Sequence, residues 1–252
     1  MAFDATAVVE EFWQARARRE YFPRAWADKL TLDQAYQIQL GLIDRRVAGG
    51  ERHIGWKVGL TAKPIQEQFG FHEPVFGCIL ESVPSGATLR SAELIAPGFE
   101  SELCLRIGQG LSGTVTMAQA RAAVAGVHPA LEIIETRGDL SAQIALAMAD
   151  NAQQKTVVLG EPVPLAEKRL DEVACRVEQN GKTVAEGTGA AVLGDPLNSV
   201  VWLAGKLAQF GRAIRAGDII MTGSFVRQFP LTKGDAVQVM FNGIGAVEVR
   251  VG

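Results

Sequence analysis

Two glutamates on one expected strand are the first residues in this sequence whose type and spacing could do chemistry. The stretch GFESELCLR, residues 98–106, alternates as a β-strand does, which places Glu100 and Glu102 on the same face. Carboxylates two residues apart on a strand lie only about 7 Å from each other and repel. Either a solvated sheet edge or a bound divalent cation would explain why an otherwise apolar strand carries this pair.

A third carboxylate lies in the apolar run HPALEIIETR, at Glu132. A buried glutamate is costly to ionise unless a cation or a hydrogen-bond partner stabilises it. Glu100, Glu102 and Glu132 together would form an all-oxygen site of the kind that Mg²⁺ or Mn²⁺ occupies. The alternative is that the first two line a wet edge and Glu132 caps a neighbouring group.

Lys57 is the other charged residue in an unexpected setting, within the apolar stretch GWKVGLT. Gly55 and Gly59 flank it, and glycines permit close approach of another backbone. A lysine in apolar surroundings can serve acid–base chemistry. It can equally extend its ammonium group to solvent from the end of a strand.

The histidines and cysteines give no comparable signal. His72 and His128 are isolated from serine or cysteine nucleophile motifs, and the sequence has no GxSxG, P-loop or dinucleotide fingerprint, so we expect both to be structural. Cys78, Cys104 and Cys175 have no metal-type spacing. We expect buried, reduced thiols.

Composition excludes several partners. The 252 residues include 25 Lys and Arg against 28 Asp and Glu, a net charge of −3, which gives no electrostatic case for nucleic acid. No apolar run approaches the length of about 18 residues that spans a membrane, and the N-terminus lacks the pattern of a signal peptide. We therefore expect a soluble, cytoplasmic protein.

The elements that must position these residues change in character near residue 55. Before it, residues 6–20 have helical periodicity, and a second helix is expected to begin at the capping box Thr31–Gln34 and end at Gly49–Gly50. After it, strands dominate, with helices expected over residues 116–127 and from Asp195–Pro196 to about Gly211.

Two Asn-Gly pairs, at residues 180–181 and 242–243, predict two-residue hairpin turns. Strands that do not alternate regularly with helices argue against a doubly wound sheet. The sequence thus predicts an α+β fold, with a short helical N-terminal part (residues 1–54) packed on a β-rich domain (residues 55–252) in one functional unit.

Several motifs in one order resemble a known family. GWKVGLT, EPVFG, FESEL, PALEIIETR, ADNA, GAAVLGDPLNSVVWLAGKL and GDIIMTG are similar to segments of the 2-keto-4-pentenoate hydratase and 4-oxalocrotonate decarboxylase family, within the fumarylacetoacetate hydrolase superfamily. The resemblance runs from about residue 30 to the C-terminus. It implies a mixed β-roll that holds a divalent metal, usually Mg²⁺, with carboxylates.

The resemblance also implies roles for individual residues. The family's E-x-E pair falls on Glu100 and Glu102, the glutamate of its PALE segment on Glu132, and the lysine of its K-x-G-L-T motif on Lys57. These enzymes act on short 2-oxo or 2-hydroxy alkenoic acids from aromatic ring cleavage, through an enolate that the metal stabilises as a Lewis acid. We expect Lys57, beside Leu60, to donate a proton or to hold the substrate carboxylate.

Two segments bear on which reaction is catalysed. Similar hydratases usually have an acid in the segment that here reads EPVFG, where Val75 stands at that position, as an apolar residue does in decarboxylases. Against that, PLNSVVWLAGKL is more similar to hydratases. SFVR resembles the SFTR segment of the hydratase that acts on a seven-carbon dicarboxylic acid. Ser224 and Arg227 of SFVR are therefore expected to bind substrate, Arg227 through a distal carboxylate.

We thus expect a hydratase, with a 4-oxalocrotonate-type decarboxylase as the nearest alternative. A C–C bond hydrolase of the same superfamily would need a water-activating His–Glu pair that the N-terminal region does not obviously supply. A weakly active partner of a homologous enzyme would bind metal without turnover. We expect a homo-oligomer or a complex with a homologous pathway enzyme.

Overall fold

A computed structural model describes residues 3–68, 70 and 72–252. The α-helices in it are α1 (Ala5–Ala17), α2 (Leu32–Ala48), α3 (Lys63–Gln68), α4 (Met117–Ala123), α5 (Ile144–Ala149) and α6 (Leu197–Ala208). Short 3₁₀ helices are η1 (Arg24–Trp26), η2 (Ser91–Glu93), η3 (Asn151–Gln153), η4 (Leu170–Glu172) and η5 (Gly189–Ala191). None of the helices in the described part of the chain has the length and apolarity needed to cross a membrane.

The larger sheet has eight strands and mixed pairing. Its strands are β1 (Gly55–Gly59), β2 (Val75–Ile79), β3 (Ser82–Pro84), β5 (Pro97–Ile107), β6 (Val124–Glu135), β7 (Gln154–Leu159), β10 (Ile219–Ser224) and β11 (Phe229–Pro230). Their order is β2-β1-β10-β5-β6-β7-β3, and β11 pairs with the start of β5. The long antiparallel pair β5–β6 forms the centre of this sheet, so residues on its faces meet the most neighbours.

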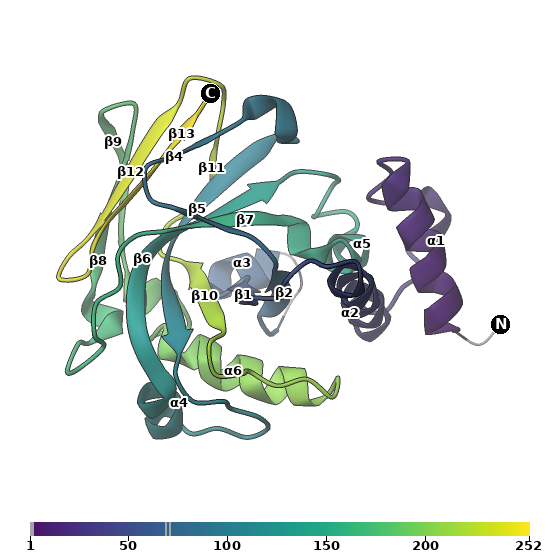
Figure 1. Cartoon of the computed structure of the whole chain (residues 1–252), viewed down its shortest axis with the longest axis horizontal. Coiled ribbons are helices and arrows are strands. Elements are labelled where there is room, and N and C mark those ends of the chain that lie inside the picture. Colours follow the sequence, from purple (N-terminus) through teal and green to yellow (C-terminus); the bar gives the residue numbers. More distant parts are fainter. Residues whose placement is uncertain (1–2, 69, 71) are drawn as a thin grey trace.

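The smaller sheet has five strands in the order β4-β13-β12-β8-β9. They are β4 (Ala87–Leu89), β8 (Ala174–Gln179), β9 (Lys182–Thr188), β12 (Ala236–Phe241) and β13 (Gly245–Val251). β6 contacts both β12 and β13, and β7 contacts β13, so the two sheets pack on each other. Figure 1 shows α1 and α2 at the opposite end of the molecule from this sheet. The architecture confirms the expected α+β fold with a mixed β-roll.

Two of the helical predictions hold closely. At α2 the Thr31 hydroxyl accepts the Gln34 N–H while the Gln34 side chain accepts the Thr31 N–H, which confirms the capping box. At α6 the Asp195 carboxylate accepts the N–H of Leu197 at 2.8 Å, as expected of a residue that caps a helix.

Three sequence predictions were wrong in detail. The first helix ends at Ala17 rather than near residue 20, because Arg19 takes a left-handed conformation with φ of 61°. The helix expected over 116–127 ends at Ala123, because Val124 already begins β6 and pairs with β5. The turn at 242–243 has three residues, since Phe241 pairs with Gly245, whereas the two-residue turn at 180–181 is confirmed.

Aromatic packing joins the N-terminal helices to the larger sheet. The ring of Tyr36, on α2, stacks on that of Phe76, on β2, with centroids 4.2 Å apart. The buried Gln39 side chain donates to the carbonyls of Phe76 and Met148, at 3.1 and 2.8 Å.

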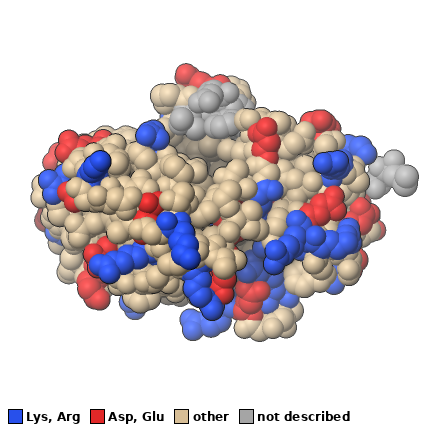
Figure 2. Space-filling model, turned by 90° about the horizontal axis from the view of Figure 1, so that it is seen from above, with Lys and Arg blue, Asp and Glu red and all other residues tan. Residues whose placement is uncertain are grey.

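Basic and acidic side chains are interspersed on the face shown in Figure 2. All three cysteines are buried and free, as expected.

Candidate metal centre and active site

The register of β5 and β6 brings the three glutamates together. Glu100 lies directly opposite Glu132, and Glu102 lies opposite Ala130, so all three carboxylates extend from one face of the strand pair. One oxygen from each carboxylate lies within 4.8 Å of the others. The opposite face of β5 carries Phe99, Leu103 and Leu105 into the main hydrophobic core.

Several of these carboxylate oxygens are buried without a partner. Glu102 and Glu132 are fully buried, and Glu100 is half-buried. Neither oxygen of Glu132, nor Oε1 of Glu102, accepts a hydrogen bond from the described part of the chain. A buried acceptor with no donor is costly, so such oxygens are typical of a site that binds an ion or a water molecule. The donor set is all oxygen and carboxylate-rich, which fits Mg²⁺ or Mn²⁺.

A backbone amide fixes the remaining oxygen of Glu102. Its Oε2 accepts the N–H of Gly223 at 2.8 Å. The ladder between β10 and β5 is irregular between Met221 and Ser224, and Gly223 has φ of 112°, a conformation that favours glycine. A Cβ at Gly223 would lie 2.4 Å from the hydroxyl oxygen of Thr61. The irregularity therefore aims an N–H at the carboxylate.

Lys57 reaches the same group of carboxylates from β1. The strand lies between β2 and β10, and the Lys57 ammonium forms an ion pair with Glu132, with Nζ and Oε1 3.4 Å apart. The side chain is 6% exposed, so the ammonium is held inside rather than extended to solvent. Gly77, its partner on β2, leaves room for the side chain, because a Cβ there would lie 3.2 Å from Cγ of Lys57.

The charges of this group shift each other's pKa. Burial raises the pKa of Glu132 to about 7, although the Lys57 ammonium opposes the rise. Burial and the charges of Glu132 and Glu100 raise the pKa of Glu102 well above its ordinary value. Burial alone would lower the pKa of Lys57, but the three carboxylates raise it. When all three carboxylates are ionised, they and the ammonium leave two negative charges, which one divalent cation would neutralise.

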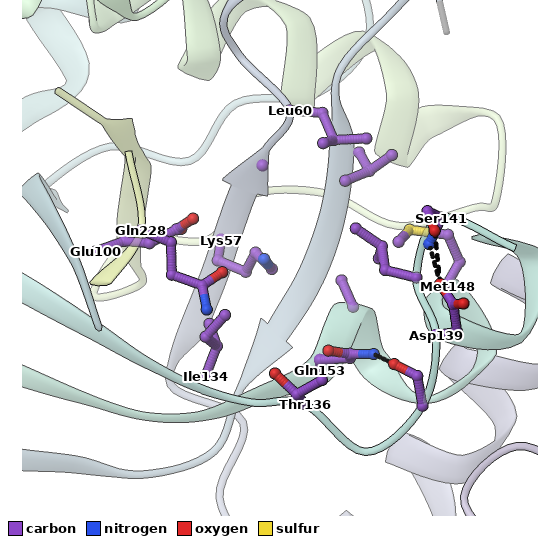
Figure 3. Close-up of a pocket in the computed structure, with 15 residues that line it drawn as sticks. Lys57, Leu60, Glu100, Ile134, Thr136, Asp139, Ser141, Met148, Gln153 and Gln228 are labelled. Carbon is purple, nitrogen blue, oxygen red and sulfur yellow. Dashed lines mark hydrogen bonds between the residues drawn. The ribbon is translucent and has the colours of Figure 1, made fainter. Parts of the chain in front are cut away.

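A cavity of about 580 Å³ opens over Lys57 and Glu100. Figure 3 shows Lys57, Glu100 and Gln228 on one side of it and Asp139, Ser141 and Met148 across from them. Residues 136, 138–141, 148, 152 and 153 form this second side, which we call the far wall. Glu102 and Glu132 lie deeper than the cavity lining, behind Lys57 and Glu100.

The other expected substrate-binding residues lie nearby but not together. Leu60 lines the main cavity and has φ of 53°. Ser224 and Arg227 instead line an adjoining cavity of about 250 Å³ that shares Leu60, Glu100 and Gln228 with the first. The Ser224 hydroxyl accepts the Ser101 N–H at 3.1 Å. Arg227 is exposed, with its guanidinium carbon 4.0 Å from the centroid of the Phe229 ring.

Val75 lines the main cavity as well, 2% exposed and paired with Gly59 across β1 and β2. Its place beside Lys57 agrees with the importance that the sequence comparison of EPVFG gives to this position. The two histidines singled out in the sequence do not line the cavity. His128 lies on β6, with Nδ1 2.8 Å from the carbonyl oxygen of Gly160.

Sequence reasoning missed the far wall. Thr136 and Gln153 present polar groups to the cavity from this wall, and Gln228 does so from the opposite side, yet none of them has a spacing that relates it to Lys57. The motif ADNA, residues 149–152, runs directly before Gln153 and was the available signal. It gave no indication of which side chain would reach the cavity.

Comparison with known proteins agrees with this geometry. The family model described as fumarylacetoacetate (FAA) hydrolase C-terminal matches residues 72–252. The chain is 35% identical over 238 residues to a 2-keto-4-pentenoate hydratase of Paraburkholderia xenovorans, covering 92% of this chain and 86% of that protein. It is 33% identical over 226 residues to a 4-oxalocrotonate decarboxylase of a Pseudomonas species, covering 88% of this chain and 86% of the relative.

A solved structure extends the likeness to three dimensions. The 4-oxalocrotonate decarboxylase of Pseudomonas putida G7, complexed with magnesium and adipate, superposes with a TM-score of 0.89 at 32% identity, covering 98% of this chain and 97% of that one. With a family model that matches most of the chain and relatives of this identity over most of its length, the chain belongs to the fumarylacetoacetate hydrolase family.

Proposed function

We propose that this protein is a divalent-metal-dependent lyase of the 2-keto-4-pentenoate hydratase type. Its substrate would be a short 2-hydroxy or 2-oxo alkenoic acid from the breakdown of aromatic compounds. The observation that carries the proposal is the group of buried carboxylate oxygens without donors, beside a buried ammonium and beneath a cavity. The names of two relatives, 2-keto-4-pentenoate hydratase and 4-oxalocrotonate decarboxylase, support the same class of substrate.

Glu100, Glu102 and Glu132 would hold Mg²⁺, the ion present in the solved decarboxylase, or Mn²⁺. When bound, the ion would act as a Lewis acid toward the carboxylate and 2-oxygen of the substrate. The protein would fix the position of the ion through the Gly223 amide, which holds one oxygen of Glu102.

Lys57 would act on the substrate as a general acid or as a fixed positive charge. Its ammonium lies inside the site, and the neighbouring carboxylates favour the protonated form. Gly59 and Gly77 leave space for its side chain, because a Cβ at either position would lie 3.2 Å from an atom of Lys57. Leu60 would contact the carbon chain of the substrate. Ser224 and Arg227 would contact the substrate from the adjoining cavity.

Decarboxylation is the second candidate, and Val75 is the observation that favours it. A valine in the lining can neither take a proton from water nor orient it. The chain therefore lacks a carboxylate at the position where similar hydratases usually have one. The high similarity to a solved decarboxylase points the same way.

One assay distinguishes the candidates. The purified protein is supplied with 2-hydroxypenta-2,4-dienoate or 4-oxalocrotonate, with Mg²⁺ or with a chelator, and the products are identified by NMR. A hydrated 4-hydroxy-2-oxo acid formed only with Mg²⁺ supports the hydratase, and CO₂ release from 4-oxalocrotonate supports the decarboxylase. Hydrolytic cleavage of a C–C bond into two organic fragments, without release of CO₂, would indicate a hydrolase. No turnover of either acid would overturn the proposal in favour of an inactive partner.

We further propose that residues 1–54 and 55–252 work as one unit in the cytoplasm, as a homo-oligomer or beside a homologous enzyme of the same pathway. The contacts of α2 with β2 and α5 support the first part, because they join the N-terminal helices to the cavity side of the sheet. Light scattering of the purified protein at several concentrations tests the oligomeric state.

A further inference from the structure

The far wall contains a strained turn. Asn151, Ala152 and Gln153 in η3 have φ of 58°, 48° and 59°, three consecutive non-glycine residues in the left-handed region. Such conformations are costly for residues with a Cβ and persist only where the surroundings impose them. Ala152 and Gln153 line the cavity directly, so whatever imposes the turn also sets the shape of the site.

Side-chain hydrogen bonds hold the turn on the side of β2. The Asn151 amide accepts the Cys78 N–H at 2.7 Å and donates to the Cys78 carbonyl at 2.8 Å, as a neighbouring strand would. The Gln153 amide donates to the carbonyl of Gly138 at 3.0 Å. This last bond ties the turn to residues 136–141, so the two parts of the far wall form one piece (Figure 3).

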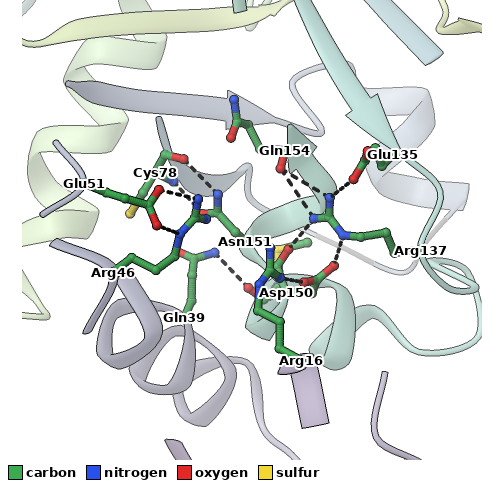
Figure 4. A network of polar contacts seen from close by, with 11 residues as sticks. Arg16, Gln39, Arg46, Glu51, Cys78, Glu135, Arg137, Asp150, Asn151 and Gln154 are labelled. Atoms are coloured by element: carbon green, nitrogen blue, oxygen red, sulfur yellow. Dashed lines mark hydrogen bonds and ion pairs between the residues drawn. The ribbon is translucent and has the colours of Figure 1, made fainter. Parts of the chain in front are cut away.

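Arg137 holds the same turn from the opposite side. Its side chain is 2% exposed, and its Nε donates to Oδ2 of Asp150 at 2.5 Å. Its Nη2 donates to the carbonyl of Asp150 at 3.0 Å, and its Nη1 to the Glu135 carboxylate at 2.8 Å. Weaker bonds of 3.4 and 3.5 Å reach the carbonyl of Gln154. One guanidinium thus contacts the chain just before and just after the left-handed residues (Figure 4).

The N-terminal segment completes this arrangement from outside. Arg16, at the end of α1, donates to Oδ1 of Asp150 at 2.7 Å. The Tyr21 ring contacts both guanidinium groups. Its centroid lies 5.0 Å from Cζ of Arg16 and 5.4 Å from Cζ of Arg137.

Two further contacts tie this segment to residues 138–143, which include part of the far wall. A Cβ at Gly138 would meet the ring of Phe22 at 2.4 Å, so the backbone of the wall lies directly against that ring. Asp28 and Gln143 exchange two hydrogen bonds, at 2.9 and 3.2 Å. The matched family model begins at residue 72, so it includes none of the residues of this segment.

We propose that Arg137 is a positioning residue for the reaction, and that residues 16–28 are a brace that keeps the far wall of the active site in place. Neither group reaches the metal centre, so they act through the shape of the cavity rather than through the chemistry. The effect on turnover rests on the proposed function, whereas the effect on the wall itself does not.

The matched pair Arg16→Met and Arg45→Met tests the brace. Each arginine joins α1 to another part of the chain and contacts one carboxylate and one aromatic ring. Arg16 contacts Asp150 and Tyr21. Arg45 contacts Glu10 and Trp13. Arg45 forms no hydrogen bond, ion pair or cation–π contact with the described residues of the far wall. In Arg16→Met the carboxylate of Asp150 keeps Arg137 as its partner, so no buried charge is left unpaired.

The first measurement does not depend on activity. We expect hydrogen exchange of the amides in residues 136–143 and 150–154 to become faster in Arg16→Met, and to keep its wild-type rate in Arg45→Met. Exchange that rises equally in both variants, or in neither, would overturn the brace.

The second measurement is turnover. We expect kcat to fall on the order of tenfold in Arg16→Met, and up to about 100-fold in Arg137→Lys, which keeps the charge but loses the fork of donors. The dissociation constant of Mg²⁺ should stay at its wild-type value in both, and Arg45→Met should keep its kcat. A wild-type kcat in a folded Arg137→Lys protein would overturn the positioning role. If the wild-type protein turns over neither acid, the proposed function fails, and hydrogen exchange still decides about the brace.

Discussion

The two sides of the cavity carry similar numbers of charged groups, but they differ in charge balance and in how fully the carboxylate oxygens are hydrogen-bonded. Behind Lys57, three carboxylates face one ammonium, an excess of two negative charges when all are ionised. Three of the carboxylate oxygens accept no hydrogen bond in the described chain. Behind the far wall, Arg16 and Arg137 balance Glu135 and Asp150, and all four carboxylate oxygens accept a hydrogen bond. We call the first side incomplete, because it has buried acceptors without a hydrogen bond, and the second complete, because each of its carboxylate oxygens accepts one.

This difference separates binding from positioning. Buried acceptors without donors destabilise the free protein, so they are retained where a ligand supplies what is missing. A balanced and fully bonded network instead fixes the backbone that carries it. Alteration of the incomplete side should therefore abolish metal binding and chemistry. Alteration of the complete side should leave metal binding unchanged and change only the rate.

The largest expected effect comes from Glu132→Gln. The amide cannot supply the negative charge that a divalent cation requires at this site, so we expect metal-dependent turnover to fall on the order of 10³-fold or more. Calorimetric titration with Mg²⁺ should lose its binding signal, while circular dichroism shows an intact fold. Glu248→Gln, an exposed glutamate on β13, is the matched control and should behave as wild type. Unchanged Mg²⁺ affinity in Glu132→Gln would refute the metal centre.

Lys57→Ala should have the next largest effect, a fall in kcat on the order of 100-fold, because the proton donor or fixed charge is lost. Lys57→Arg should not restore turnover, since a planar guanidinium does not replace a compact ammonium. Mg²⁺ binding should persist in both. Lys206→Ala removes another buried lysine, paired with Glu73 at 2.7 Å, and should retain wild-type turnover per folded molecule. Wild-type rates in Lys57→Ala would make the residue structural.

Val75→Asp tests which reaction the incomplete side supports. A carboxylate at this position could take a proton from water, so we expect the ratio of hydration to decarboxylation to rise about tenfold or more. Val75→Asn has nearly the same shape without the basic group, and it should leave the ratio at the wild-type value. NMR of the products at matched Mg²⁺ concentration gives the ratio. A wild-type hydratase rate that neither substitution changes would remove Val75 from the mechanism.

The smallest expected effect is on stability. Mg²⁺ at about 100 times its dissociation constant should stabilise the folded state by about 2.7 kcal/mol, which for a chain of this size raises Tm by about 5–10 °C. Calorimetric melting with Mg²⁺ and with chelator measures the shift. It should disappear in Glu102→Gln and persist in Arg16→Met, which alters only the complete side. A shift of equal size in all three proteins would mean that the ion binds elsewhere.

Much of the incomplete side could be predicted from the sequence. Glu100 and Glu102 share a face because a strand alternates with a period of two, and this holds wherever the strand lies. The capping box at Thr31 and the turn at 180–181 were equally local and were confirmed. The helix over 116–127 was extended too far, because pairing with β5 takes over at Val124, and pairing partners are not visible in a local pattern.

Only the tertiary structure decided what faces these carboxylates. The register of β5 and β6 sets Glu132 opposite Glu100. The position of β1 in the sheet brings Lys57 to Glu132. The irregular ladder at Gly223 supplies a backbone donor to Glu102. The far wall depends entirely on the tertiary structure, because Arg16, Arg137 and Asp150 meet across sequence separations of up to 134 residues. Local sequence determines the conformation and the face of a residue. Which distant groups share a site depends on how the sheets and helices pack, which no short stretch of residues determines.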